Sequence, residues 1–173
     1  MSSDITARLI KAVKRRSGLR ISLNRIFNGR DCHGRKIKEE KLEIDEILYS
    51  PLIRAADTAR HIAQETGIPC RQEPRLTEQN FGKYESTARD GAVFQEAKKQ
   101  FVNHFEGGET MLHLAQRIYN LLDELKQESA NKTYLLVAHN GIARVVNSYF
   151  YDMENGEYAA FGIKNCEIRK YQF

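Results

Sequence analysis

The sequence predicts an α/β fold in which helices are layered on a largely parallel central sheet. Short apolar runs typical of buried strands alternate along the chain with amphipathic runs of helical period, and this alternation defines the class. The length of 173 residues and the hydrophobic content of 41% suit one globular domain over residues 1–173. No apolar run approaches the roughly 18 residues that a membrane-spanning helix requires.

The N-terminal part of the chain predicts a helix, a strand and a second helix. Residues 4–16 place apolar side chains at helical spacing among basic ones, which is typical of a short amphipathic helix. Residues 19–24 alternate enough to form a strand. Asn-Gly and His-Gly pairs at 28–29 and 33–34 indicate turns, and the charged run 36–43 indicates the second helix.

A buried strand and a long helix are predicted around residue 50. The apolar run 47–49 leads into a Ser-Pro pair, which is typical of a strand that ends in a loop. Ala, Ile and Thr side chains at helical spacing predict a helix over 54–66, and Gly67 ends it. Residues 69–76 are expected to be extended.

The second half of the chain continues the alternation. Helices are predicted over 94–105 and 111–128, and the second of these has one apolar and one polar face. The apolar run 134–138 predicts the most strongly buried strand, and 141–150 predicts a helix after it. The tail, 166–173, alternates apolar and polar side chains as an edge strand does.

Basic side chains are concentrated at the N-terminal end. Residues 1–44 hold 12 Lys and Arg against 5 Asp and Glu, whereas the remainder holds 15 against 18. Such an end can contact nucleic acid or an anionic membrane. No aromatic residue interleaves with the charges of its first helix, so we favour a solvated basic face with neither partner. Cys32, Cys70 and Cys166 form no C-x-x-C pair, which favours a reduced, cytoplasmic setting.

Two predicted strand ends carry side chains suited to an anion. Arg54 follows the strand 47–49, and His139 follows the strand 134–138 at the start of a helix. The carboxyl ends of parallel strands meet at one edge of the sheet, where α/β proteins bind ligands. A helix N-terminus with an arginine fork favours an oxyanion, and a histidine exchanges protons near neutral pH. Each residue alone is better explained by a surface ion pair or a helix cap, but together they predict a phosphate or carboxylate pocket.

Four sequence motifs resemble, in the same order, those of the histidine phosphatase superfamily, which is also called phosphoglycerate-mutase-like. The resemblance covers residues 45–173 and leaves 1–44 as an atypical basic segment. It implies a three-layer fold with a mostly parallel central sheet flanked by helices. With x for unmatched positions, the motifs are Ser50-Pro51-Leu52-x-Arg54-Ala55, Leu76-Thr77-Glu78-x-x-Phe81-Gly82, Gly107-Gly108-Glu109-Thr110 and Leu135-Leu136-Val137-Ala138-His139-Asn140-Gly141.

The resemblance implies a phosphomonoesterase that acts without metal or cofactor on a phosphorylated small molecule or protein. In this family a histidine attacks phosphorus and forms a transient phosphohistidine, which water then hydrolyses. Carried over motif by motif, Arg54 clamps the phosphoryl group, His139 is the second, phosphate-binding histidine and Glu78 protonates the leaving oxygen. Asn140 is expected to bind phosphate at the start of its helix, and Glu109 to order the local backbone.

The family's first strand is followed by an Arg-His-Gly triplet, which this sequence lacks. The strand 19–24 is expected to fill that central strand position, so Arg25 just after it is one candidate for the first phosphate clamp. His33, followed by Gly34, is the candidate nucleophile, although the local pattern favours a histidine that serves only a turn. Without a nucleophile, the chain would be an inactive relative that binds a phosphorylated ligand or a protein partner. A phosphoglycerate-type mutase is a further alternative.

Overall fold

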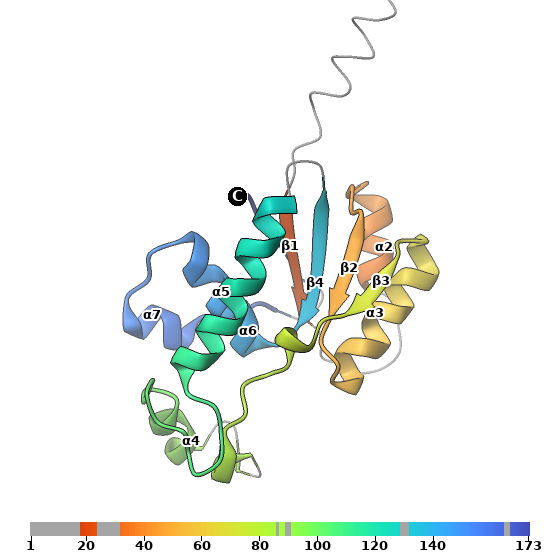
Figure 1. The fold of residues 1–173 in the computed structure, drawn as a ribbon. Coiled ribbons are helices and arrows are strands. Elements are labelled where there is room, and N and C mark those ends of the chain that lie inside the picture. The colour runs from red at the N-terminus through yellow and green to blue at the C-terminus, as the bar shows by residue number, and fades with distance from the viewer. Residues whose placement is uncertain (1–17, 24–31, 86, 89–90, 129–131, 165–166) are drawn as a thin grey trace, which may run out of the picture.

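The structure is a computed structural model built around one five-stranded sheet (Figure 1). It describes residues 18–23, 32–85, 87–88, 91–128, 132–164 and 167–173. The strands lie in the order β3-β2-β4-β1-β5, and neighbours are parallel except that β5 runs antiparallel to β1. The strands are β1 (Gly18–Leu23), β2 (Glu46–Tyr49), β3 (Cys70–Gln72), β4 (Thr133–Ala138) and β5 (Ile168–Tyr171).

Helices cover both faces of the sheet. Helices α2 and α3 contribute to one hydrophobic core, and helices α5 and α6 contribute to the other. The α-helices are α2 (Cys32–Glu39), α3 (Ile53–Thr66), α4 (Ala92–Ala97), α5 (Met111–Glu128), α6 (Asn140–Phe150) and α7 (Asn155–Ala160). Two short 3-10 turns, η1 (Pro74–Leu76) and η2 (Gly82–Tyr84), lie between β3 and α4.

Strand β4 shows why helices are needed on both faces. All six of its residues are buried. Leu135 and Val137 join the core beneath α2 and α3, whereas Tyr134 and Leu136 join the core beneath α5 and α6. Successive strand side chains point to opposite faces, so a strand covered on both sides is a continuous apolar run. This arrangement confirms the predicted three-layer α/β class.

Strand β1 occupies an interior position of the sheet. Its six residues pair in parallel with the whole of β4, from Gly18 opposite Thr133 to Leu23 opposite Ala138. Its other edge pairs with β5, so β1 links the C-terminal edge strand to the rest of the sheet. An empty position here would leave backbone groups of β4 without partners inside the fold, at a large cost in free energy. The strand predicted over 19–24 is therefore confirmed.

Several predicted elements are confirmed nearly to the residue. Helix α3 ends at Thr66, and Gly67 follows with a left-handed φ of 75° while its N–H donates to the Ala63 carbonyl at 2.8 Å. Glycine tolerates this conformation best because it has no Cβ. Helix α5 has the predicted bounds. The tail forms the predicted edge strand, as β5.

The prediction around α2 is wrong in its boundaries. The helix begins at Cys32, so His33 and Gly34 lie in its first turn and not in a loop, and it ends at Glu39 instead of residue 43. The first backbone N–H groups of a helix have no partner within the helix, so a glycine in this turn is tolerated. The helix predicted over 4–16 and the turn at 28–29 lie outside the described residues.

The helix predicted over 94–105 is also wrong, because only Ala92–Ala97 is helical in this stretch. Phe94, Ala97 and Phe105 pack with Phe81 in a small core of their own, at a distance from the sheet. Phe105 and Glu106 have left-handed φ values of 54° and 56°, which turn the chain back toward Phe81. The apolar residues of this segment therefore fill a local cluster instead of one helix face.

Two smaller findings complete the fold. The stretch predicted as extended over 69–76 contains only the three-residue strand β3 before η1 begins, and α7 has no counterpart among the predictions. Within the described ranges, none of the helices combines the length and the hydropathy that a membrane span requires.

Candidate active site

The site lies at the carboxyl edge of the sheet, where β2 and β4 end side by side. The backbone N–H of Ser50 donates to the Val137 carbonyl at 3.0 Å, which continues the β2–β4 ladder by one residue. His139 follows β4 in extended conformation and is the N-cap residue of α6. Its ring is 4% exposed, and its Nε2 lies 2.8 Å from Oγ of the fully buried Ser50.

Arg54 reaches the same point from the start of α3. Its Nη2 lies 3.4 Å from Nδ1 of His139, on the opposite side of the ring from Ser50. Burial and, to a smaller extent, the Arg54 charge lower the pKa of His139 to about 4. The imidazole is therefore neutral at physiological pH in this arrangement. A guanidinium, an imidazole and the N-terminus of an 11-residue helix converge here, as predicted from the strand ends.

Glu78 completes the site from the loop that follows η1. Its carboxylate accepts hydrogen bonds from the backbone N–H of Gln79 at 3.0 Å and from that of Gly141, in the first turn of α6, at 3.3 Å. Burial raises the pKa of the Glu78 carboxyl, against the opposing effects of these N–H groups and of the Arg144 and Arg54 charges. The acid form of Glu78 therefore persists to higher pH than that of an exposed glutamate.

Arg117 of α5 holds the loop that carries Glu78. It donates to the Thr77 carbonyl at 2.7 Å and to the Arg75 carbonyl. It also forms a two-point ion pair with the Glu109 carboxylate, at 2.7 and 2.9 Å. The Gln79 amide donates to the Glu109 backbone carbonyl at 3.0 Å. Glu109 thus orders the local backbone, as predicted, and Arg117 is a positioning residue that the sequence reasoning missed.

Arg144 is a second residue that the sequence reasoning missed. It lies one turn into α6, its Nε donates to the Phe161 carbonyl at 3.3 Å, and its guanidinium carbon is 5.9 Å from the Tyr158 ring centroid. Its positive charge favours the ionised form of Glu78. The available sequence signal was its spacing, since residues four apart on a helix share a face and Arg144 follows Asn140 by four.

The Asn140 side chain has a structural contact. Its Oδ1 accepts a hydrogen bond from the backbone N–H of Ile163 at 3.2 Å, which ties the start of α6 to the segment after α7. A Cβ on Gly162 would lie 3.3 Å from this oxygen, so the two segments approach closely. A phosphate contact by Asn140 stays a prediction.

With the geometry described, the comparison with protein families decides the relationship. The model of the histidine phosphatase superfamily (branch 1) matches residues 32–173. The chain belongs to the histidine phosphatase superfamily. The resemblance of its four motifs is thereby confirmed.

Individual relatives agree with this assignment. The protein named probable phosphoglycerate mutase GpmB of Yersinia pestis is 29% identical over 137 residues, which cover 75% of this chain and 64% of that protein. The chain thus spans less than two thirds of that relative's length. A mycobacterial glucosyl-3-phosphoglycerate phosphatase in complex with inorganic phosphate superposes with a TM-score of 0.69 at 20% identity, covering 89% of this chain and 88% of that one. The alpha-ribazole phosphatase of Shigella flexneri gives 0.66 at 16% identity, covering 88% and 89%. At such identities the likeness concerns the histidine phosphatase fold alone.

Two predicted site residues of this superfamily member are not placed with their side chains. Arg25 lies outside the described residues, and of His33 only the backbone is described, as the second residue of α2. The topology still locates this backbone. Helix α2 ends shortly before β2 begins, and β2 begins at the amino edge of the sheet. The last turn of α2 therefore lies toward the amino edge, and its first turn lies toward the carboxyl edge. Strand β1 ends at Leu23 opposite Ala138, next to His139.

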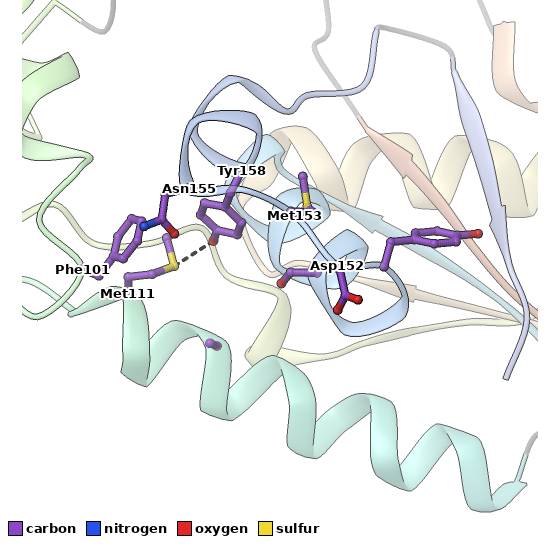
Figure 2. Close-up of a pocket in the computed structure, with 9 residues that line it drawn as sticks. Phe101, Met111, Asp152, Met153, Asn155 and Tyr158 are labelled. Atoms are coloured by element: carbon purple, nitrogen blue, oxygen red, sulfur yellow. Dashed lines mark hydrogen bonds between the residues drawn. The ribbon is translucent and has the colours of Figure 1, made fainter.

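A cavity of about 260 Å³ opens beside the site, between α5, the C-terminal half of α6 and α7 (Figure 2). Phe101, Met111 and Tyr158 form one end of it, and Asp152 lies toward the other. The Tyr158 hydroxyl donates to Sδ of Met111 at 2.8 Å. Tyr158 also lies against Arg144, whose charge acts on Glu78, so the cavity adjoins this side of the site. Over the part of the chain that the structure describes, no three His, Cys, Asp or Glu side chains gather closely enough to hold a metal ion.

Proposed function

We propose that this chain is a phosphomonoesterase that acts through a phosphohistidine. The observation that supports it most directly is the convergence at the start of α6, where Arg54 approaches the ring of the N-cap residue His139 and Glu78 accepts the N–H of Gly141. Phosphoryl transfer requires positive charge on the equatorial oxygens, and Arg54, the helix N-terminus and an imidazole N–H supply it. The carboxylic acid of Glu78 protonates the leaving oxygen.

The nucleophile in this proposal is His33. A ring nitrogen of His33 attacks phosphorus, the P–O ester bond breaks, and the Glu78 carboxyl gives its proton to the departing alcohol oxygen. Water then attacks the phosphohistidine, the P–N bond breaks, and inorganic phosphate leaves. Arg25, two residues beyond β1, serves as a further clamp. The topology of α2, whose first turn points toward the carboxyl edge, supports this choice.

The substrate in this proposal is a phosphorylated small molecule. The cavity beside Tyr158 would receive the organic part of the ester, because it adjoins the acid side of the site and combines aromatic, thioether and carboxylate groups. Residues 1–173 would form one domain, with 1–44 as its atypical segment. The names of the relatives are in keeping with this class: a glucosyl-3-phosphoglycerate phosphatase, an alpha-ribazole phosphatase and a probable phosphoglycerate mutase.

The first test is hydrolysis of p-nitrophenyl phosphate between about pH 5 and pH 8 without added metal. We expect turnover that is lost in His139→Ala and in His33→Ala, and retained in His61→Ala, which removes an exposed histidine of α3. Rapid quenching of the wild type should trap an acid-labile phosphoryl label that His33→Ala lacks. Turnover that persists in His33→Ala would exclude this nucleophile, and absence of turnover in the folded wild type would exclude the enzyme.

A binding-only relative is the second candidate, and the missing Arg-His-Gly triplet favours it. It predicts no turnover together with phosphate binding that Arg54→Ala weakens. The phosphoglycerate-type mutase is distinguished from a phosphatase by its product. A mutase would convert 3-phosphoglycerate to 2-phosphoglycerate, whereas a phosphatase yields glycerate and inorganic phosphate.

A further inference from the structure

Ser50 is the fully buried partner of the site histidine. Its Oγ lies 2.8 Å from Nε2 of His139 and accepts the backbone N–H of Leu52 at 3.3 Å. Both side chains are shielded from bulk solvent, since Ser50 is 0% exposed and His139 only 4%. The hydrogen bonds of the His139 ring therefore depend on two neighbours. Ser50 faces Nε2, and Arg54 faces Nδ1.

The proton on His139 can be assigned from its two neighbours, Arg54 and Ser50. A guanidinium can only donate, so Nδ1, which faces Arg54 at 3.4 Å, must accept. A neutral imidazole carries one proton, which then lies on Nε2 and points at Ser50. The Ser50 oxygen accepts two N–H groups in this state, from His139 and from Leu52.

A bound phosphoryl group reverses the hydrogen-bonding role of Nδ1. Its oxygens only accept, so Nδ1 must now donate, and the Arg54 fork turns to the same oxygens. The ring can meet this demand by gaining a proton or by moving its own proton from Nε2 to Nδ1. The second route leaves Nε2 as an acceptor, and the Ser50 hydroxyl can rotate to donate to it.

We infer that Ser50 and His139 form a tautomer switch, in which the hydroxyl changes from acceptor to donor so that a neutral His139 donates to the phosphoryl group. This inference deepens the proposed function and rests on it. In the occupied state Ser50 accepts from Leu52 and donates to His139, so both of its capacities are used. Ser50 is a positioning residue here, because it acts on the substrate through His139.

Charges around the ring favour the switch over protonation. Among the described residues, Arg54 approaches the ring directly from α3, and Arg144 lies one turn further along α6 beside Glu78. Both guanidiniums oppose a third positive charge, and Glu78 is drawn toward its neutral form by burial. The pKa of His139, which burial and the Arg54 charge lower to about 4, agrees with a ring that resists protonation.

The test uses inorganic sulfate on the full chain, because sulfate stays a dianion at neutral pH and any proton taken up must bind to the protein. Calorimetry near pH 7 in two buffers of different ionisation enthalpy measures that uptake. We expect none, with a Kd that changes less than about twofold between about pH 6.5 and pH 8. Uptake of one proton instead would weaken binding about tenfold per pH unit and would overturn the switch.

Long-range proton–nitrogen NMR of the His139 ring tests the same inference directly. We expect a neutral Nε2–H ring in the free protein and a neutral Nδ1–H ring with sulfate. An imidazolium in the complex, or a ring whose tautomer is the same in both states, would contradict it. Glu78→Gln and His33→Ala, which remove the other two titratable side chains that we propose for the site, should each leave both results unchanged.

Ser50→Ala removes the hydroxyl with little change in volume. Nε2 of the occupied state then has no donor, so we expect at least tenfold weaker sulfate binding near pH 7.5 and an imidazolium in the complex. Thr66→Ala is the matched control, because it also deletes a hydroxyl from the α3 region, outside the site. Unchanged sulfate affinity and an unchanged tautomer in Ser50→Ala would overturn the role of Ser50. Failure of the folded protein to bind sulfate or phosphate at all would overturn the proposed function itself.

Discussion

Glu78 and Gly141 are joined by a hydrogen bond from the α6 backbone to the carboxylate, 3.3 Å long, across 63 positions of sequence. The bond ties the acid-bearing loop to the helix turn that follows His139. It also makes the absence of a side chain at position 141 a steric requirement, because a Cβ there would overlap the Glu78 carboxylate. The proposed acid and the proposed anion-binding turn are therefore positioned by one contact.

Gly141→Ala should displace Glu78 while the fold is kept, since alanine favours helices. We expect kcat to fall about 10- to 100-fold for alkyl phosphates, whose leaving oxygen needs a proton, and much less for p-nitrophenyl phosphate. Gly156→Ala is the control, because a Cβ at that position in α7 meets no atom within 4 Å. Equal losses for both ester types would argue against Glu78 as the acid.

The buried His139 should make the protein sensitive to acid. Its pKa of about 4 in the folded state lies below the unfolded value of 6.5, so the unfolded chain binds the proton more readily. This stabilisation is present above pH 6.5 and is lost as the pH falls toward 4. It amounts to about 2 to 3 kcal/mol by pH 4.5. Urea unfolding near pH 7 and near pH 4.5 gives the free energy of unfolding of the wild type and of His139→Gln. We expect the wild type to lose about this much more than the variant between the two pH values. An equal loss in both proteins would refute the prediction.

Arg117→Lys should loosen the loop that carries Glu78. Lysine cannot reproduce the two-point pair with Glu109 together with the bonds to two loop carbonyls. We expect a loss of about 1 to 3 kcal/mol in the free energy of unfolding and a lower kcat. Arg60→Lys, at an exposed pair with Asp57 on α3, should change neither quantity. An unaltered kcat in Arg117→Lys would show that the loop holds its position without this network.

Ala115→Leu should fill the cavity between α5 and α7. We expect a higher KM for esters with a bulky organic group, and an unchanged inhibition constant for inorganic phosphate, which does not reach the cavity. Gln116→Leu adds the same side chain to an exposed neighbouring position of α5 and serves as the control. If KM rose equally for large and small esters, the cavity would not be the place of the organic group.

Local sequence patterns predicted those helices and strands whose structure is determined by their own residues. The apolar face of α5 and the continuous apolar run of β4 needed no knowledge of the partners that cover them. The convergence of Arg54 and His139 followed from the general rule that parallel strands end at one edge. The helix expected over 94–105 failed because the burial of Phe105 depends on Phe81, which the local pattern does not contain.

The contacts that refine the site depend on register between distant segments. Ser50 meets His139 only because Tyr49 pairs with Val137, and no property of either residue alone predicts that alignment. Arg117 acts through backbone carbonyls, which have no identity in a sequence motif. Asn140 contacts the Ile163 backbone, which becomes its neighbour only after α7 has folded back.

The interior position of β1 has a consequence for synthesis on the ribosome. Strand β1 is made before its parallel partner β4, which lies more than a hundred residues later in the chain. The antiparallel partner β5 follows β4. During translation β1 must therefore wait, and this part of the sheet closes only after β4 and β5 have been made. Such late, long-range closure is slow and exposes strand edges to aggregation, so chaperones that shield nascent strands should raise the yield of native protein.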